Sequence, residues 1–146
     1  MPPMLSFLPA GLRGALAGLA LGLNTLIFTL LMVPPALVKL VLPLPGVRTV
    51  CDRMLNALAS RWVANNDAWI TAVNPRAVWD VQGVASLHPR GWYLVSSNHQ
   101  SWVDILVLQR VLHGHVPFLK FFLMAELIWV PVIGLACWAL DFPFMK

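Results

Sequence analysis

The most constraining feature of this sequence is an apolar run from Ala15 to Val33, in which Asn24 is the only strongly polar side chain. As a helix rising 1.5 Å per residue, the run extends roughly 28 Å, about the thickness of a bilayer's hydrocarbon core. The apolar core of a secretory signal peptide is shorter, about 7–15 residues, and a small-residue cleavage site follows it. Here Pro34 and Pro35 follow instead. The run therefore favours an uncleaved membrane helix over a signal peptide.

The composition supports a membrane-associated protein. Hydrophobic residues make up 59% of the chain and charged residues only 11%, whereas a soluble domain carries about 25% charge. Ten Lys and Arg against six Asp and Glu give a net charge of +4. These basic residues are scattered and form no stripe, so we expect no nucleic-acid partner. A basic excess beside an apolar segment suits anionic lipid headgroups, and the seven Trp suit the membrane–water interface.

A second apolar stretch, 36–44, is interrupted by Lys39 and is too short to cross a bilayer alone. It can form a re-entrant hairpin with the first helix or lie in the interface. One arginine precedes the first span, and four basic residues follow it: Lys39, Arg48, Arg53 and Arg61. The positive-inside rule then places everything after the span on the cytoplasmic side. We expect residues 1–46 to be membrane-inserted, with the bacterial inner membrane as the location.

The segment 52–73 reads as a connecting helix, because apolar residues recur near helical spacing and Asn74-Pro75 follows. Its tryptophans can dip into the bilayer surface or pack in a core. We assign residues 47–75 to this connecting region and 76–146 to a globular part. In that part, strands are predicted at 78–81, 92–97, 116–119 and 142–145, with turns at Gly83 and 89–91. Helices are predicted at 105–112, 126–129 and 135–140. This alternation predicts an α/β fold.

Four polar side chains follow the predicted strand 92–97, namely Asn98, His99, Ser101 and Asp104. The structural interpretation is a helix cap, in which Ser101 accepts from the amide of Asp104 and the Asp carboxylate faces the positive end of the helix dipole. This accounts for Ser101 and Asp104, but not for Asn98 or His99.

The chemical interpretation makes His99 a general base. With His99 in the loop and Asp104 in the first helical turn, the carboxylate can bind one imidazole nitrogen and leave the other as a proton acceptor. Sites in α/β folds lie beyond the carboxyl ends of strands, where Asn98 stands. Since no Ser or Cys nucleophile occupies a recognisable elbow, a substrate hydroxyl is the natural group to deprotonate.

The stretch Asn-His-Gln-Ser-Trp-Val-Asp over 98–104 resembles the NHxSxxD signature of the glycerolipid acyltransferases, typified by 1-acyl-sn-glycerol-3-phosphate acyltransferase. Phe-Leu-Lys over 118–120, Glu126-Leu127, Pro131 and Gly134 resemble the family's strand with a lysine and its following Glu-Leu, Pro and Gly positions. The end of the chain, 136–146, is similar to the approach to the family's second conserved block, especially in the lysophosphatidylinositol and lysocardiolipin branch. The resemblance covers about 78–146.

The resemblance implies an α/β acyltransferase domain that follows an N-terminal membrane helix or helical hairpin. It implies that His99 deprotonates a lysophospholipid hydroxyl, that Asp104 orients His99, and that no acyl-enzyme forms. The donor would be acyl-CoA or acyl-carrier protein, and membrane lipids the other partners. Asn98, Ser101 and Lys120 would contact substrate, with Lys120 at the headgroup phosphate; a solvated or structural lysine is the alternative there. No metal and no cofactor is expected.

The family's phosphate-binding block, of the FPEGTR type, is missing from the sequence. We therefore expect a chain truncated at its carboxyl end, which would be inactive by itself. The alternative function is a small membrane-anchored protein without catalysis, or an inactive fragment of an acyltransferase. Cys51 and Cys137 are far apart and lie among apolar residues, so we expect two small buried side chains and no disulfide or zinc site.

Overall fold

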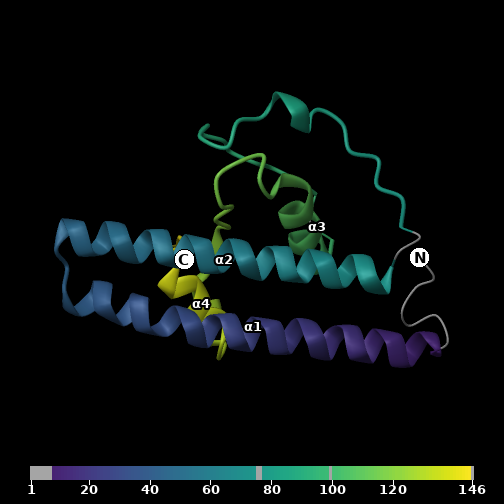
Figure 1. The fold of residues 1–146 in the computed structure, drawn as a ribbon, viewed down its shortest axis with the longest axis horizontal. Coiled ribbons are helices and arrows are strands. Elements are labelled where there is room, and N and C mark those ends of the chain that lie inside the picture. The colour runs from purple at the N-terminus through teal and green to yellow at the C-terminus, as the bar shows by residue number, and fades with distance from the viewer. Residues whose placement is uncertain (1–7, 75–76, 99, 146) are drawn as a thin grey trace. The chain divides into compact units, whose positions relative to one another are not determined.

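The computed structural model describes residues 8–74, 77–98 and 100–145, which are mostly helical. The elements in chain order are α1 (Ala10–Val41), α2 (Pro45–Val73), η1 (Val84–Ser86), α3 (Val103–Leu112), β1 (Leu123–Met124), η2 (Ala125–Trp129), α4 (Ile133–Ala139) and β2 (Phe144–Met145) (Figure 1). The chain divides into two compact units. One contains α1 up to Leu21 together with 63–119, and the other contains 22–62 together with the chain from Lys120 onward.

The apolar helix α1 continues through Pro34 and Pro35 to Val41. The stretch predicted over 36–44 is therefore largely part of the same helix. An internal proline removes a hydrogen-bond donor and crowds the carbonyl four residues earlier. Met32 and Ala36, on either side of the prolines, are only 2% and 0% exposed. Their burial, and the tolerance of apolar helices for proline, explain why the helix does not stop there.

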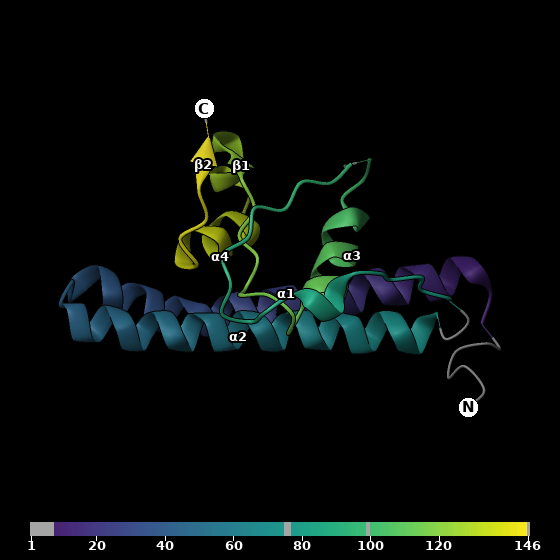
Figure 2. The ribbon, with the colours of Figure 1, turned by 90° about the horizontal axis from the view of Figure 1, so that it is seen from above.

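In the second unit, α1 and α2 lie side by side and antiparallel (Figures 1 and 2). The buried side chains of α2 recur every four residues, at Cys51, Leu55 and Ala59, and so share one face of the helix. Ala36 and Ala59 are both 0% exposed. Such small residues let two helix backbones approach closely.

Helix α2 begins at Pro45, a first-turn position where the missing N–H has no partner to lose. It ends at Val73, which confirms the stop predicted from the Asn74-Pro75 pair. The predicted helix over 52–73 is thus confirmed and begins two turns earlier than expected.

Polar groups of α1 in this unit lie against α2. The side-chain amide of Asn24 donates to the carbonyl of Trp62 at 3.2 Å, and the Trp62 indole N–H donates to Thr25 Oγ1 at 3.2 Å. Thr29, one turn further along α1, is only 3% exposed. The outward side chains of α1 are instead apolar, including Leu19, Leu23, Ile27, Leu30 and Leu37. The polar stripe of an otherwise apolar helix is therefore covered by its neighbour.

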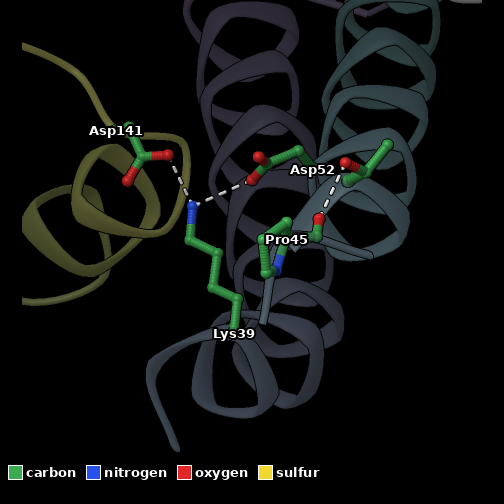
Figure 3. A network of polar contacts seen from close by, with 5 residues as sticks. Lys39, Pro45, Asp52 and Asp141 are labelled. Atoms are coloured by element: carbon green, nitrogen blue, oxygen red, sulfur yellow. Dashed lines mark hydrogen bonds and ion pairs between the residues drawn. The ribbon is translucent and has the colours of Figure 1, made fainter. Parts of the chain in front are cut away.

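Near the end of α1, the buried Lys39 joins three segments of the second unit (Figure 3). Its Nζ lies 3.1 Å from Asp52 Oδ1 of α2 and 2.6 Å from Asp141 Oδ2, just after α4. The lysine side chain is 9% exposed, whereas the two aspartates are 42% and 50% exposed. Because a buried ammonium needs anionic partners, this ion network holds the C-terminal segment against the helical hairpin.

That C-terminal segment contains the strand pairing found among the described residues. Strands β1 and β2 are parallel, with Leu123 opposite Phe144 and Met124 opposite Met145 (Figure 2). Helices η2 and α4 form the connection, as parallel strands require. The predicted helices at 126–129 and 135–140 and the strand in 142–145 are confirmed.

A tight turn at Val132 fixes how α4 meets η2. Val132 has φ 70° and ψ −59°, and the amide of Ile133 donates to the Pro131 carbonyl at 2.8 Å. These values describe a γ-turn of the strained, positive-φ kind. The chain then brings Gly134 so close to η2 that a Cβ atom there would overlap the carbonyl of Ile128. Only glycine fits this position without a shift of the backbone.

In the first unit the predicted turns are confirmed, because Gly83 has φ 81° and the amide of Gly91 donates to the His88 carbonyl at 2.9 Å. Three predicted strands are wrong within the described residues. The segments 78–81 and 92–97 have no regular structure, and in 116–119 only Val116 makes an isolated bridge, with His113.

The physical reason is the lack of pairing. A strand is stabilised by a neighbouring strand and by packing of its faces. Trp92 and Leu94 are 100% and 88% exposed, so nothing in the described residues covers this apolar segment. The α/β class therefore stays a prediction, represented here by the β1–β2 pair alone.

The ion network at Lys39 gives a stability prediction. In the double variant Asp52→Asn with Asp141→Asn, the buried ammonium loses its partners, which we expect to cost toward the lower end of about 3–5 kcal/mol because both aspartates are half-exposed. Lys39→Met should cost less, since it removes the buried charge itself. Adding Lys39→Met to the double variant should recover part of the loss. Thermal unfolding in detergent micelles measures all three, and a triple variant less stable than the double variant would contradict the network.

Candidate active site

The polar joint predicted after 92–97 lies where an irregular segment meets α3. The helix begins at Val103, two residues before the predicted start at Ile105, and ends at Leu112 as predicted. Trp102 precedes the first helical residue and makes no side-chain capping bond. The amides at this helix start are bound instead by side chains from the joint itself.

Asp104 holds the loop that leads into α3. Its Oδ2 accepts the backbone amide of Gln100 at 2.6 Å and that of Ser101 at 2.8 Å. Bonds from an amide to a carboxylate are about twice as strong as neutral ones. The carboxylate also lies in the first turn, where the helix dipole favours negative charge. Asp104 thus fixes the backbone on the N-terminal side of the helix.

Ser101 acts differently from the predicted cap. The amide of Asp104 donates to the main-chain carbonyl of Ser101 at 3.1 Å, and it is the amide of Val103 that donates to Ser101 Oγ, at 3.3 Å. The hydroxyl therefore closes a turn two residues long. The predicted bond between the Ser101 hydroxyl and the Asp104 amide is wrong, because the main-chain carbonyl takes that donor.

The remaining predicted site residues are placed as follows. His99, the predicted base, lies outside the described residues. Asn98 and Ser101 are exposed, and Asp104 is partly buried. Lys120 is exposed and belongs to the other compact unit. The structure thus brings Ser101 and Asp104 together at one helix start.

One polar cluster beside this helix is missing from the sequence predictions. Arg110, in the last turn of α3, forms an ion pair with Asp67 Oδ1 at 2.5 Å and donates to Thr71 Oγ1 at 2.9 Å. The Trp79 ring lies under its guanidinium, 4.6 Å away. The spacing of Asp67 and Thr71 by one helical turn indicates a shared face, but no pattern in the sequence indicates Arg110 as the partner.

Neither described cysteine suits nucleophilic chemistry. Cys51 is buried, and both Cys51 and Cys137 are free thiols. Burial raises the pKa of the Cys137 thiol from its usual 9.0 to about 11, so it is protonated at neutral pH, and the thiolate is the reactive form. Among residues 8–74, 77–98 and 100–145, no group of three or more His, Cys, Asp or Glu side chains could hold a metal ion.

Comparison with known proteins identifies the region that contains this site. A family model described as "Acyltransferase" matches residues 78–146. A 1-acyl-sn-glycerol-3-phosphate acyltransferase alpha of Ovis aries is 45% identical over 60 residues, which are 40% of this chain and 20% of that protein. The Homo sapiens protein of the same name is 43% identical over the same shares. No solved structure matches.

The matched stretch is short, since the chain spans about a fifth of the length of the curated relatives it matches. The family match nevertheless contains the Asp104 loop, α3, and the segment from β1 to β2. Residues 78–146 therefore belong to the glycerolipid acyltransferase family.

Proposed function

We propose that this protein transfers a fatty acyl group from acyl-CoA or acyl-carrier protein to the free hydroxyl of a lysophospholipid such as 1-acylglycerol-3-phosphate, in phospholipid synthesis or remodelling. The matched relatives are named 1-acyl-sn-glycerol-3-phosphate acyltransferases. The observation that carries the proposal is the anchoring of the loop by Asp104 within the matched region, two charge-assisted bonds at 2.6 and 2.8 Å.

In the proposed mechanism, His99 takes the proton of the acceptor hydroxyl. The oxygen attacks the thioester carbonyl, an ester C–O bond forms, the C–S bond breaks, and the proton passes from His99 to the departing thiolate. Asp104 orients His99, because a carboxylate with about four acceptor positions can accept an imidazole N–H as well as backbone amides. A fixed loop favours catalysis because the two substrates must meet in a defined geometry.

Substrate contacts are assigned to three residues by the same proposal. Asn98 and Ser101 flank His99 in the sequence, and both are exposed, which suits a role in substrate binding. Lys120 is also exposed and is proposed to pair with the phosphate of the headgroup, since a lysine ammonium binds phosphate as a point charge.

The alternative is a membrane-anchored protein without catalysis, in which Asp104 only caps α3. One observation favours it, because both amides that Asp104 binds lie in the loop directly before α3, so the carboxylate has a local structural role at the entry into the helix. The two functions differ in one expectation. Only the enzyme needs the Asp104 charge for turnover once the protein is folded.

The variant Asp104→Asn separates them. Both accounts expect a loss of about 0.5–2 kcal/mol in stability, typical of a lost helix cap. Only the enzyme account expects turnover per folded molecule to fall strongly, toward the roughly 10²–10⁴-fold that a general base contributes. Because the 146-residue chain is expected to be inactive by itself, turnover here and below is measured on the full-length protein. The assay follows release of free CoA with 1-acylglycerol-3-phosphate in mixed micelles. Asp80→Asn is the matched control, because the exposed Asp80 carboxylate binds only the neighbouring Gln82 among described contacts. Full turnover by folded Asp104→Asn would leave only the capping role.

The direct transfer is tested through Cys137. A rise in pKa from 9.0 to about 11 lowers the thiolate fraction roughly 100-fold at neutral pH, so alkylation between pH 7 and 9 should be slower than that of a free thiol by about this factor. Cys137→Ala should keep acyl transfer within about twofold, within the usual range for a substitution away from the reacting groups. An acyl thioester on Cys137 of the parent enzyme together with loss of turnover in Cys137→Ala, or rapid alkylation that stops turnover, would argue for a covalent cysteine intermediate.

For the location, we propose a hairpin that lies in one leaflet of the bacterial inner membrane, with the acyltransferase region on the cytoplasmic face. Gly11–Val41 is the helix in the described chain that is long and apolar enough to cross a bilayer. However, α2 packs along it and exposes Arg48, Arg53 and Arg61. Charges at the bilayer centre are costly, so a crossing α1 would carry its neighbour's arginines into hydrocarbon.

A position in the interface resolves this conflict. The apolar outer side of α1 then faces the acyl chains, and the arginines of α2 face anionic headgroups. At the closed end of the hairpin there is also an open, wholly apolar cavity of about 480 Å³, which lipid chains can fill. It is lined by Pro34, Pro35, Val38, Gly46, Val47, Val50, Cys51 and Met54.

Cysteine labelling tests this location. In a background with Cys51→Ala and Cys137→Ala, single cysteines are placed at Leu8, before α1, and at Leu44, between the helices. An in-leaflet hairpin predicts that a membrane-impermeant maleimide never labels Leu44→Cys from the periplasmic side, and that Leu8→Cys is labelled only from the cytoplasmic side. Asn74→Cys reports the side of the far end of α2. Labelling of Leu44→Cys from the periplasm would show that the hairpin crosses.

A further inference from the structure

Arg110 joins three segments of the first unit at one point. Its guanidinium pairs with Asp67 at 2.5 Å, donates to Thr71 Oγ1 at 2.9 Å, and lies 4.6 Å from the Trp79 ring centroid. The Thr71 hydroxyl in turn donates to the Asp67 carbonyl at 2.9 Å. The arginine side chain is 21% exposed and that of Asp67 is 39% exposed. The cluster is thus a partly buried polar contact between α2, α3 and the start of the family region.

Polar contacts supplement the apolar packing that holds α3. Gln109 is the fully buried residue of this helix, and its apolar side chains from Ile105 to Leu112 are partly buried. Apolar packing is not directional, so by itself it leaves a helix free to roll or slide on its neighbour. A guanidinium with two partners one turn apart, and an aromatic ring on its face, is directional. Arg110 therefore adds the directional contact that fixes the rotation and height of α3 on α2.

The two ends of α3 carry different tasks. Arg110 follows Asp104 by six residues, about 9 Å along the axis and roughly 120° around it. When Arg110 faces α2, Asp104 therefore points to another side, where its carboxylate holds the amides of Gln100 and Ser101. The contact with α2 leaves the motif side of the helix open.

We propose that Arg110 is a positioning residue, which locks α3 on α2 and thereby holds the Asp104 loop in its working geometry. This inference rests on the proposed acyl transfer for its effect on turnover, but its structural part does not. A purely stabilising ion pair is the alternative; such a pair would change the fraction of folded protein and nothing in the folded molecule.

The test compares Arg110→Met, Arg110→Lys and Asp67→Asn, with Arg90→Met as the matched control at an exposed arginine of the same unit. Arg110→Met keeps the apolar stem, and Arg110→Lys keeps the charge without the fork. Circular dichroism measures the folded fraction of each. For folded Arg110→Met we expect kcat with 1-acylglycerol-3-phosphate to fall at least roughly tenfold, since a misplacement of about 1 Å costs up to about 10²-fold. Arg110→Lys should recover part of the loss.

Two further measurements make the result decisive. If Arg110 acts through Asp67, Arg110→Met should change kcat less than about twofold in the Asp67→Asn background. The reason is that the contact is already lost there, and the effects of two substitutions in one contact do not add. Hydrogen exchange at the Gln100 and Ser101 amides should quicken in Arg110→Met and stay unchanged in Arg90→Met. Asp67→Asn supplies the same readouts should Arg110→Met fail to fold.

Unchanged exchange at these two amides in a folded Arg110 or Asp67 variant would overturn the positioning role, whether or not the protein transfers acyl groups. Faster exchange in a protein whose parent form shows no acyl transfer would keep the positioning role and reject the proposed function. Faster exchange together with the loss in kcat supports both.

Discussion

A buried ammonium at the end of an apolar helix is the interaction on which the arrangement of the second unit depends. Lys39 can remain at 9% exposure only because Asp52 and Asp141 supply negative charge from two other segments. The pairing brings residues 13 and 102 positions away in sequence to one point. The first unit uses the same device, since Arg110 ties α3 to α2 through Asp67. In each unit, a part of residues 78–146 is thus joined to a long helix by the ion pair of one basic side chain, Lys39 of α1 or Arg110 of α3.

The sequence predicted elements whose signals are local. The apolar run of α1, the stop of α2 before Asn74-Pro75, and the helix that follows the polar joint depend on composition and neighbours within a few residues. The strand predicted at 92–97 failed for the opposite reason. Its aromatic and apolar residues suit a sheet, but pairing requires a second strand, and the strands among the described residues pair only at β1 and β2. The continuation of α1 through two prolines likewise depends on burial against α2, which no local pattern records.

At the candidate site, the same division applies. Asp104 was predicted from the motif, and its position at the start of α3 follows from sequence spacing. The Gln100 and Ser101 amides reach its carboxylate because of the path that the loop follows, and sequence spacing alone does not determine that path. Arg110 was missed because its partners on α2 lie 39 and 43 residues earlier in the chain. Partners of a long-range ion pair are not linked by any pattern in a single sequence, whereas the residues of a compact motif can be recognised from their spacing.

The stripe of polar groups between α1 and α2 has a consequence for biosynthesis. The ribosome completes α1 before α2, yet Asn24 and Lys39 find their partners on later parts of the chain. A newly made α1 that entered lipid by itself would carry these groups into hydrocarbon without hydrogen bonds. If the hairpin lies in the membrane as proposed, release of α1 into the bilayer would wait until the second helix has emerged and folded back. On this view the two helices are inserted as one unit, and the timing of translation becomes part of the assembly of the protein.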